Sequence, residues 1–251
     1  MSKNKKRLDQ YLVDSGTFEN AEDVKRAVIA HEVRVDTTYV DSAAIMIELD
    51  DQDVAKVEIY IKNQKQFVSR GGHKLQEAID EFNIEVSGKH CLDIGSSTGG
   101  FTDCLLQAGA ADVACVDVNY GQLAWRLRQD DSVKAFERLN IKEADPKTLG
   151  APFDLVVTDV SFISLASIAE VVASMCKAGS VFIGLIKPQF ECRRGETVNG
   201  VVEDEAVRQR TIDEVVEAYK NVGFSDPKIK QSPLRGPAGN IEYLIYTIKE
   251  A

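Results

Sequence analysis

The sequence predicts an α/β protein in which a small N-terminal α+β domain precedes a mostly parallel seven-stranded sheet with an antiparallel hairpin at one edge. From Gly88 onward, short apolar runs alternate with amphipathic helical segments, as in parallel strands covered by helices on both faces. The last two apolar runs are separated by only a short turn, which indicates an antiparallel pair. Before residue 62 this alternation of apolar runs and helical segments is absent, which predicts a separate unit.

The first 61 residues predict a compact unit of two helices followed by strands. Helical spacing of apolar residues predicts a helix over RLDQYLVDSG, and Asn20 is in place to cap a second helix over NAEDVKRAVIA. The segments VRVDTTYV and VEIYI are extended in pattern. We therefore expect one domain over residues 1–61, a linker over 62–72 that ends at the breaker Gly71-Gly72, and a second domain over 73–251.

The second domain begins with an amphipathic helix over HKLQEAIDEFNI. The seven expected strands that follow are HCLDIG, VACVDV, VKAFERLN, FDLVVTDV, SVFIGLIKP, DPKIKQSPL and EYLIYTIK. The expected helices between them are FTDCLLQAG, GQLAWRLRQD, SLASIAEVVASMC and DEAVRQRTIDEVVEAYKNVG.

Composition narrows the class of protein. A hydrophobic content of 44% with 28% charged residues is ordinary for a protein with a buried core. No apolar run approaches a membrane span, and the five cysteines form no C-x-x-C pair. With three isolated histidines as well, we expect a cytoplasmic protein with reduced thiols, no metal and no membrane partner.

The net charge of −10 argues against a nucleic-acid partner unless positive charge is concentrated somewhere. Residues 62–77 contain four Lys/Arg and one Asp/Glu, between two acidic halves. Such a band can bind phosphates, although a solvated linker would have the same composition.

The run LDIGSSTGGFT, residues 92–102, predicts a glycine-rich turn between a strand and a helix. A phosphate-binding loop would need lysine where Phe101 stands, and a nicotinamide fingerprint would need glycine where Ser97 stands. A hydrolase nucleophile elbow at Ser97 would need a later histidine, but all three histidines precede it. The turn therefore faces some ligand that need not carry phosphate.

In parallel sheets, ligands bind at the carboxyl ends of the strands. The residues that follow the first five expected strands are Asp93 with Gly95, Asp117, Asn140, Asp159 and Lys187. Asp117 is suitably spaced from the turn to bind the ribose hydroxyls of an adenosine cofactor, with a helix cap as the alternative. Lys187 sits between apolar FIGLI and Pro188, where this fold places function.

Several ordered blocks resemble the TlyA family, known both as haemolysins and as ribosomal RNA 2′-O-methyltransferases. They are VSRGGHKL, STGGFTDCLLQ, YGQLAW, DVSFISL, LIKPQFE and GNIEYL. The second domain also resembles FtsJ-type ribose methyltransferases, which implies a Rossmann-like class I methyltransferase fold. KRLDQYLVDSG resembles an S4-type RNA-binding domain, but His31 and Asp36-Thr37 replace that family's usual glycine and Asn-Gly turn.

The resemblance implies S-adenosylmethionine as cofactor and a lysine-acid tetrad, here Lys74, Asp159, Lys187 and Glu242. The cofactor-binding residues it implies are Asp93, Gly95, Ser96, Ser97, Gly99, Gly100, Phe101, Asp117, Asn140 and Asp159. Lys187 is the expected general base, with Lys74 as a neighbouring charge that favours its neutral amine. Asp159 and Glu242 would position the amines. Phe162 and Phe190 could stack on a base or be buried in the rim.

The implied substrate is ribosomal RNA or a ribosomal subunit, with cytidine ribose as acceptor. The residues expected to contact RNA are Arg7, Lys62, Lys65, Arg70, Arg193 and Arg194. The last two lie in QFECRRGETVNGVV, a glycine-containing loop that could be a mobile flap or an ordinary solvated loop. Two alternatives stay open: a membrane-active haemolysin, and an RNA-binding protein that has the cofactor pocket but no chemistry.

Overall fold

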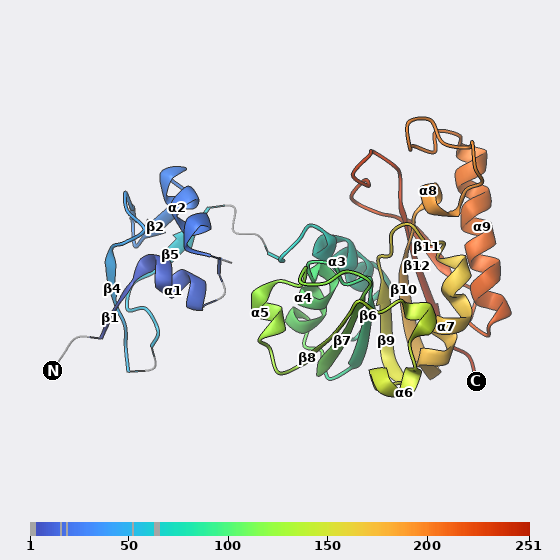
Figure 1. Cartoon of the computed structure of the whole chain (residues 1–251), viewed down its shortest axis with the longest axis horizontal. Coiled ribbons are helices and arrows are strands. Elements are labelled where there is room, and N and C mark those ends of the chain that lie inside the picture. Colours follow the sequence, from blue (N-terminus) through green and yellow to red (C-terminus); the bar gives the residue numbers. More distant parts are fainter. Residues whose placement is uncertain (1–3, 16, 19, 52, 63–65) are drawn as a thin grey trace. The chain divides into compact units, whose positions relative to one another are not determined.

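The computed structural model describes residues 4–15, 17, 18, 20–51, 53–62 and 66–251 (Figure 1). The chain divides into two compact units, residues 1–66 and 67–251. The division falls inside the segment 62–72 that the sequence predicts as a linker.

The first unit packs two helices, α1 (Leu8–Asp14) and α2 (Ala21–Ile29), with two small antiparallel sheets. One sheet pairs β1 (Lys5–Arg7) with β4 (Met46–Glu48), and the other has the order β3 (Thr38–Tyr39), β2 (Val33–Val35), β5 (Ile59–Ile61). Asn20 caps α2 by accepting from the backbone N–H groups of Glu22 and Asp23, both at 3.0 Å. The core of this first unit contains Leu8, Leu12, Val24, Val28, Val33 and Ile47. The assignment as an S4-type RNA-binding domain stays a prediction.

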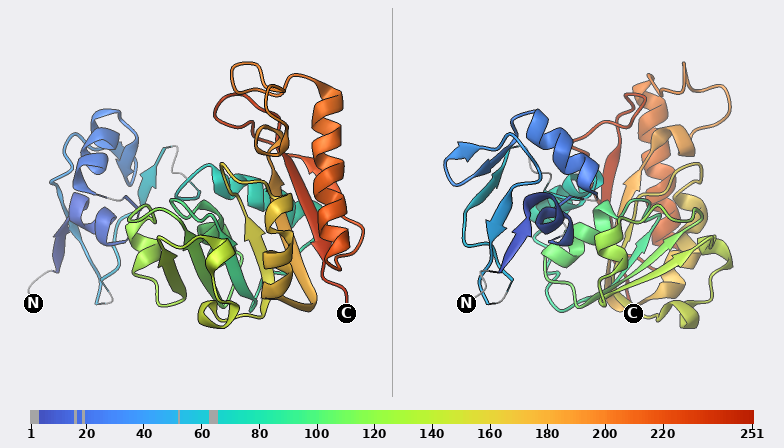
Figure 2. Two further views of the ribbon diagram at one scale, coloured as in Figure 1. Left: turned by 45° about the vertical axis from the view of Figure 1, so that its right-hand side comes forward. Right: turned by 60° about the vertical axis from the view of Figure 1, so that its left-hand side comes forward.

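The second unit is built on one seven-stranded sheet with the order β11-β12-β10-β9-β6-β7-β8. The strands are β6 (His90–Ile94), β7 (Asp112–Asp117), β8 (Val133–Glu137), β9 (Phe153–Thr158), β10 (Cys176–Ile186), β11 (Lys228–Gln231) and β12 (Tyr243–Ile248). Neighbours from β10 to β8 are parallel, whereas β12 is antiparallel to both β10 and β11. The predicted sheet, mostly parallel with antiparallel strands at one edge, is confirmed (Figure 2).

The antiparallel pairing expected of the last two strands is confirmed, but the connection between them is longer than the short turn expected. Residues 232–242 form a loop instead, and the chain returns through β12 between β10 and β11. Proline and glycine within SPLRGPAGN prevent regular structure, and Arg235 closes the loop by donating to the carbonyl oxygen of Gly239 at 3.1 Å. This loop delivers Glu242 to the carboxyl edge of β10.

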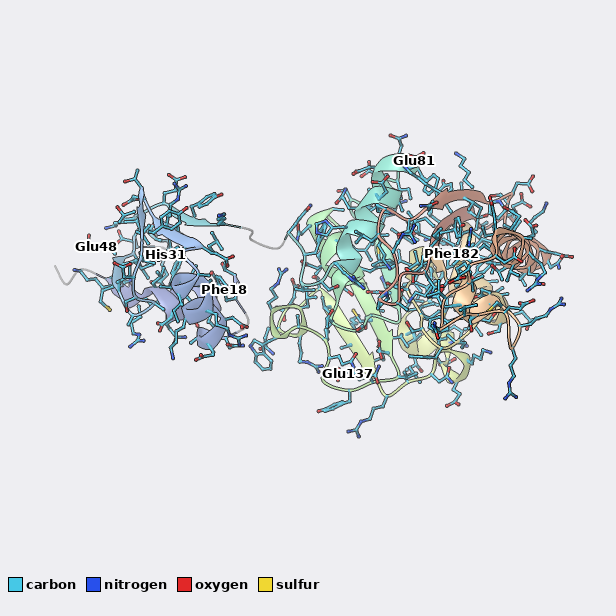
Figure 3. The ribbon with its side chains drawn as sticks, turned by 90° about the horizontal axis from the view of Figure 1, so that it is seen from above. Phe18, His31, Glu48, Glu81, Glu137 and Phe182 are labelled. Carbon is cyan, nitrogen blue, oxygen red and sulfur yellow. The ribbon has the colours of Figure 1, made fainter. Side chains whose placement is uncertain are left out.

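Helices cover both faces because successive residues of a buried strand point to opposite sides. Leu92 and Ile94 pack in a core with α7 (Ala169–Met175) and α9 (Glu205–Asn221). Cys91 and Leu155 pack in a core with α3 (Gly71–Phe82) and α4 (Gly100–Gln107). Phe182, labelled in Figure 3, lies inside the first of these cores and stacks on Tyr219, with ring centroids 4.5 Å apart. The α-helices of this unit are α3 (Gly71–Phe82), α4 (Gly100–Gln107), α5 (Trp125–Arg128), α6 (Pro146–Leu149), α7 (Ala169–Met175), α8 (Pro188–Glu191) and α9 (Glu205–Asn221).

Gly71 and Gly72, predicted as a breaker, are instead the first two residues of α3. Phe67 is fully buried against this turn, and a Cβ atom on Gly72 would lie 2.3 Å from its ring. Glycine is therefore needed at position 72 for close packing.

Candidate active site

The glycine turn links β6 to α4 and brings backbone close to two neighbouring elements. Gly95 and Gly99 have φ angles of 82° and 95°, which glycine adopts without strain. A Cβ atom on Gly95 would lie 3.1 Å from the carbonyl oxygen of Asp159, and one on Gly99 would lie 2.3 Å from the side chain of Leu127. The turn thus lies directly against the end of β9 and against α5.

Asp93 lies beneath this turn and anchors the start of α4. Its Oδ2 accepts from the Thr102 backbone N–H at 3.0 Å and from the Thr102 hydroxyl at 2.7 Å. Complete burial raises the pKa of Asp93 to about 7. Asp93 therefore supports the turn from beneath and does not line either of the two cavities that open at this edge of the sheet.

Asp117 ends β7 and holds the turn from the other side. Its Oδ2 accepts from the Ser97 N–H and its Oδ1 from the Asn119 N–H, both at 2.8 Å. Ser97 has a φ of 50°, and its hydroxyl donates to Gln122 Oε1 at 3.3 Å. Since a carboxylate offers about four acceptor positions, Asp117 can hold the turn and still accept from ligand hydroxyl groups.

Two cavities open at this edge of the sheet. The first, of about 300 Å³, is lined by Ser69, Arg70, Gly71, Lys74, Gly95, Ser96, Ser97, Thr98, Gly100, Phe101, Asp159, Ser161, Lys187, Pro237 and Glu242. The second, of about 460 Å³, is lined by Ser161, Phe162, Lys187, Gln189, Phe190, Thr197, Gly200, Pro237, Ala238, Asn240 and Glu242. Ser161, Lys187, Pro237 and Glu242 line both, so the two cavities share a wall.

The structure brings the four predicted catalytic residues together as two ion pairs. Lys74 Nζ lies 2.6 Å from Glu242 Oε2, and Lys187 Nζ lies 2.6 Å from Asp159 Oδ1. Lys74, Lys187 and Glu242 are buried. Lys187 also donates to the Ser161 hydroxyl at 2.9 Å. Each lysine has its own carboxylate, so the direct partners of Lys187 are Asp159 and Ser161. The expectation that Lys74 favours the neutral amine of Lys187 stays a prediction.

Sequence reasoning missed Glu191, which fixes the geometry around Lys187. Its carboxylate accepts from the Ser164 hydroxyl and from the Leu165 N–H, both at 2.6 Å, and thereby ties the loop after β9 to α8. Burial raises the pKa of Glu191. The only sequence signal was its place in KPQFE, directly after the strand that ends at Lys187.

Two aromatic rings stand at the second cavity. Phe162 is 92% exposed and has a φ of 64°, an uncommon conformation for a bulky residue. Its ring centroid lies 5.1 Å from that of Phe190, which is half-buried. Backbone strain and exposure at one aromatic residue point to a functional role, so burial in the rim does not describe Phe162.

Asn240, which sequence reasoning also missed, attaches the loop after α8 to the loop before β12. Its Oδ1 accepts from the Val202 N–H at 2.9 Å, and its Nδ2 donates to the Gly200 carbonyl oxygen at 2.8 Å. Asn240 is 2% exposed, so both groups of its amide are satisfied internally. The loop that carries Arg193 and Arg194 is therefore fixed where it borders the second cavity.

The predicted cofactor residue Asn140 is not among the residues that line the two cavities. It follows β8 and caps a 3₁₀ turn, Ile141–Glu143, by accepting from the Lys142 N–H at 3.1 Å. Its role toward a cofactor stays a prediction.

The basic residues predicted to contact RNA are distributed over both units. Arg7 pairs with Asp9 at 2.6 Å in the first unit, and Lys62 is exposed there. Arg70 is exposed and lines the first cavity at the start of α3. Lys65 lies outside the described residues.

Arg193 and Arg194 are exposed beside the second cavity. Arg193 reaches Glu214 of α9 at 3.7 Å, and Arg210 pairs with Glu196 at 2.5 Å. These pairs connect the loop to α9, whereas Arg194 has none within the described part of the chain.

The described residues contain neither a membrane-spanning helix nor a metal-binding cluster. None of their helices is long and apolar enough to cross a membrane. Nor do they contain a group of three or more His, Cys, Asp or Glu side chains placed to hold a metal ion. The cysteines Cys91, Cys104, Cys115, Cys176 and Cys192 are all free.

The fold and the site define a methyltransferase, and a family model described as FtsJ-like methyltransferase matches residues 67–249. A protein from Mycobacterium tuberculosis (strain ATCC 25618 / H37Rv), the 16S/23S rRNA (cytidine-2'-O)-methyltransferase TlyA, is 38% identical over 96% of this chain and 88% of its own length. The chain belongs to the TlyA family of FtsJ-like methyltransferases.

Two further relatives carry the other name used in this family. Hemolysin A from Brachyspira hyodysenteriae is 37% identical over 96% of this chain and 99% of its own length. The solved structure of a candidate hemolysin from Streptococcus thermophilus is 37% identical, covers 99% of this chain and 90% of its own, and superposes with a TM-score of 0.72. The likeness thus extends over both units.

Proposed function

We propose that this protein transfers a methyl group from S-adenosylmethionine to the ribose 2′-hydroxyl of a cytidine in ribosomal RNA. The observation that carries the proposal is the shared wall: Lys187 and Glu242 border both the cavity at the glycine turn and the cavity between Phe162 and Phe190. A methyl donor in the first cavity and an acceptor in the second would meet at Lys187. The choice of ribosomal RNA as substrate and of cytidine as acceptor comes from the name of the relative from Mycobacterium tuberculosis.

The first cavity fits S-adenosylmethionine in its chemistry. Gly95 and Gly100 line this cavity at positions where a Cβ atom would collide with Asp159 and Ser69, so the turn packs closely at its edge. Phe101 stands where a triphosphate-binding loop would need lysine. The cofactor carries no phosphate. Asp117 does not itself line the first cavity, but it accepts from the N–H of Ser97, which does, and from this position it would accept from the ribose hydroxyls. The cofactor supplies an electrophilic methyl group on its sulfonium.

In the proposed reaction, Lys187 acts on the acceptor hydroxyl. A ribose 2′-hydroxyl is a poor nucleophile, so its proton must leave as the new O–C bond forms. Lys187 Nζ in its neutral form takes that proton and becomes the ammonium that Asp159, 2.6 Å away, stabilises. The hydroxyl oxygen of Ser161 accepts a hydrogen bond from the same nitrogen and so limits the rotation of the Lys187 side chain. Lys74 and Glu242 form the rest of the wall as a charge-balanced pair.

Phe162 and Phe190 can hold the acceptor nucleotide. Stacking on aromatic rings is how proteins commonly hold an unpaired RNA base. The exposed ring of Phe162 offers such a surface at the mouth of the second cavity.

Ribose methylation should be mapped in ribosomes from a strain that lacks this protein and from its parent. We expect one or more cytidine 2′-O-methyl groups to be missing from the mutant and to return when the purified protein and S-adenosylmethionine are added to its subunits. Identical methylation maps, with no transfer of labelled methyl to any subunit, would favour a binding protein without chemistry.

The haemolysin alternative is kept open by the names of the relatives. Purified protein, free of detergent and lipid, should not lyse red cells if RNA methylation is its activity. Lysis that is independent of Lys187 would support the alternative.

Replacing Asp117 by alanine should weaken S-adenosylmethionine binding markedly, because the change removes both the ribose acceptor and the bond to the Ser97 N–H. Calorimetry on the folded protein measures the affinity for S-adenosylmethionine. Asp131→Ala is the matched control, an exposed acid on the loop before β8. Equal affinities for Asp117→Ala and wild type would remove Asp117 from the cofactor site.

Reversing the charge of Lys62 should weaken RNA binding and flatten its dependence on salt, if the basic band binds phosphates. Lys62→Glu alone and together with Lys65→Glu should be compared with Lys25→Glu, which changes an exposed lysine on α2. Filter binding over a range of salt concentrations gives the slopes. Equal slopes for all these proteins would mean that RNA follows another path.

A further inference from the structure

The polar groups around the second cavity differ in whether their hydrogen bonds are already made. Glu242 is satisfied on both oxygens, by Lys74 on Oε2 and by Gln189 on Oε1. Asn240 uses both ends of its amide on the backbone of Gly200 and Val202. Gln189 is satisfied at one end only: its Oε1 is buried and has no hydrogen-bond partner among the described residues.

The orientation of the Gln189 amide follows from chemistry. Glu242, paired with Lys74, is a carboxylate and can only accept, so the nitrogen of the amide must face it. The observed contact is Gln189 Nε2 to Glu242 Oε1 at 3.2 Å. The oxygen of the amide is thereby fixed as an acceptor that points away from Glu242. A buried acceptor without a donor is costly, so such a group in a native protein calls for an explanation.

We infer that Gln189 Oε1 is the group that recognises the acceptor base, by accepting a hydrogen bond from the 4-amino group of cytosine. The inference rests on the proposed function and names the feature of the substrate that this site selects. Cytosine presents an amino donor at position 4, where uracil presents a carbonyl acceptor. Facing Gln189 Oε1, cytosine completes the missing hydrogen bond, whereas uracil places two acceptors against each other.

Gln189 could instead serve only to orient Glu242. That role predicts equal losses for every acceptor base when Gln189 is changed, because Glu242 belongs to the wall and does not distinguish bases. Recognition of the amino group predicts a loss that depends on the base. The two roles are therefore separable by substrate, and the separation does not depend on the stability of any variant.

The test uses the RNA that the wild-type protein methylates, with one of three nucleosides at the acceptor position: cytidine, uridine, or the pyrimidin-2-one riboside that lacks the 4-amino group. Single-turnover rate divided by RNA dissociation constant is measured at saturating cofactor. For wild type we expect a loss of roughly five- to a hundred-fold on removing the amino group, the range for a buried acceptor left without its donor. Uridine should lose more.

Methionine has a similar length to glutamine but no amide group. For Gln189→Met we expect the rate divided by the RNA dissociation constant to fall on cytidine by a factor similar to that found for wild type on removing the amino group. On the 4-deamino analogue, Gln189→Met should be little worse than wild type. Gln209→Met, at an exposed glutamine of α9, is the control. The inference is overturned if wild type methylates cytidine and the analogue equally, or if Gln189→Met lowers both by one factor. If wild type methylates no cytidine in any ribosomal RNA, the proposed function itself fails, a result distinct from these two.

Discussion

Replacing Lys187 by alanine should reduce the single-turnover rate of methyl transfer by roughly a hundred- to ten-thousand-fold, the usual contribution of a general base. The cofactor affinity and the fold should change little, because Lys187 also lines the second cavity, where the acceptor is proposed to bind, and its partners Asp159 and Ser161 stay in place. The rate should be measured at saturating RNA and cofactor, which separates chemistry from binding.

Lys177→Ala is the matched control, because Lys177 lies on the same strand, β10, and pairs with Asp154 at 2.6 Å away from the cavities. It should transfer methyl at the parental rate. A near-parental rate for Lys187→Ala would refute the assignment of the base. A loss of rate matched by an equal loss of cofactor affinity would place Lys187 in the cofactor site and leave the base unidentified.

Replacing Glu242 by alanine should lower the free energy of unfolding by about 3–5 kcal/mol, the range for removing one partner of a buried ion pair. The change leaves the ammonium of Lys74 buried without a counterion and also removes the acceptor of Gln189 Nε2. Denaturant unfolding of the whole chain measures the loss. In the fraction that stays folded, the chemical step should suffer less than in Lys187→Ala, because Glu242 supports the wall and takes no proton.

Glu81→Ala is the control for stability. Glu81 lies on α3 at the surface and pairs with Lys230 in solvent, so its loss should cost less than about 1 kcal/mol (Figure 3). Lys74→Met combined with Glu242→Leu should recover most of the stability lost in Glu242→Ala, since it removes both charges. If Glu242→Ala unfolds at the same denaturant concentration as wild type, the pair does not hold the wall together.

Most of the sheet could be predicted because its central strands are apolar on both faces and separated by helical segments. The position of β12 between β10 and β11 could not be predicted. A strand inside the sheet and a strand at its edge can have the same local pattern of side chains. Residues 232–234 and Glu242 were expected within the last two strands but belong to the loop between them. Gln231 and Tyr243 are paired at the ends of β11 and β12, so strand pairing alone does not require a loop of this length.

The candidate site likewise contains residues that could be predicted from the sequence and residues that could not. Asp159 and Lys187 could be found from the rule that strands deliver function at their carboxyl ends. Lys74 and Glu242 are 168 residues apart, and only resemblance to a family pointed to them before the structure joined them. Gln189, Glu191 and Asn240 were missed, because what distinguishes them is which of their hydrogen bonds are made, and those partners come from distant loops.

The insertion of β12 between β10 and β11 also sets the order in which the site can come into being. A chain synthesised only as far as residue 241 has the glycine turn, Asp159 and Lys187, but Lys74 has no carboxylate to neutralise it. The wall between the two cavities closes only when β12 adds to β10 and carries Glu242 into place. The same strand contributes Ile245 to one core and Leu244 to the other, so the packing of the sheet and the wall between the cavities are completed together.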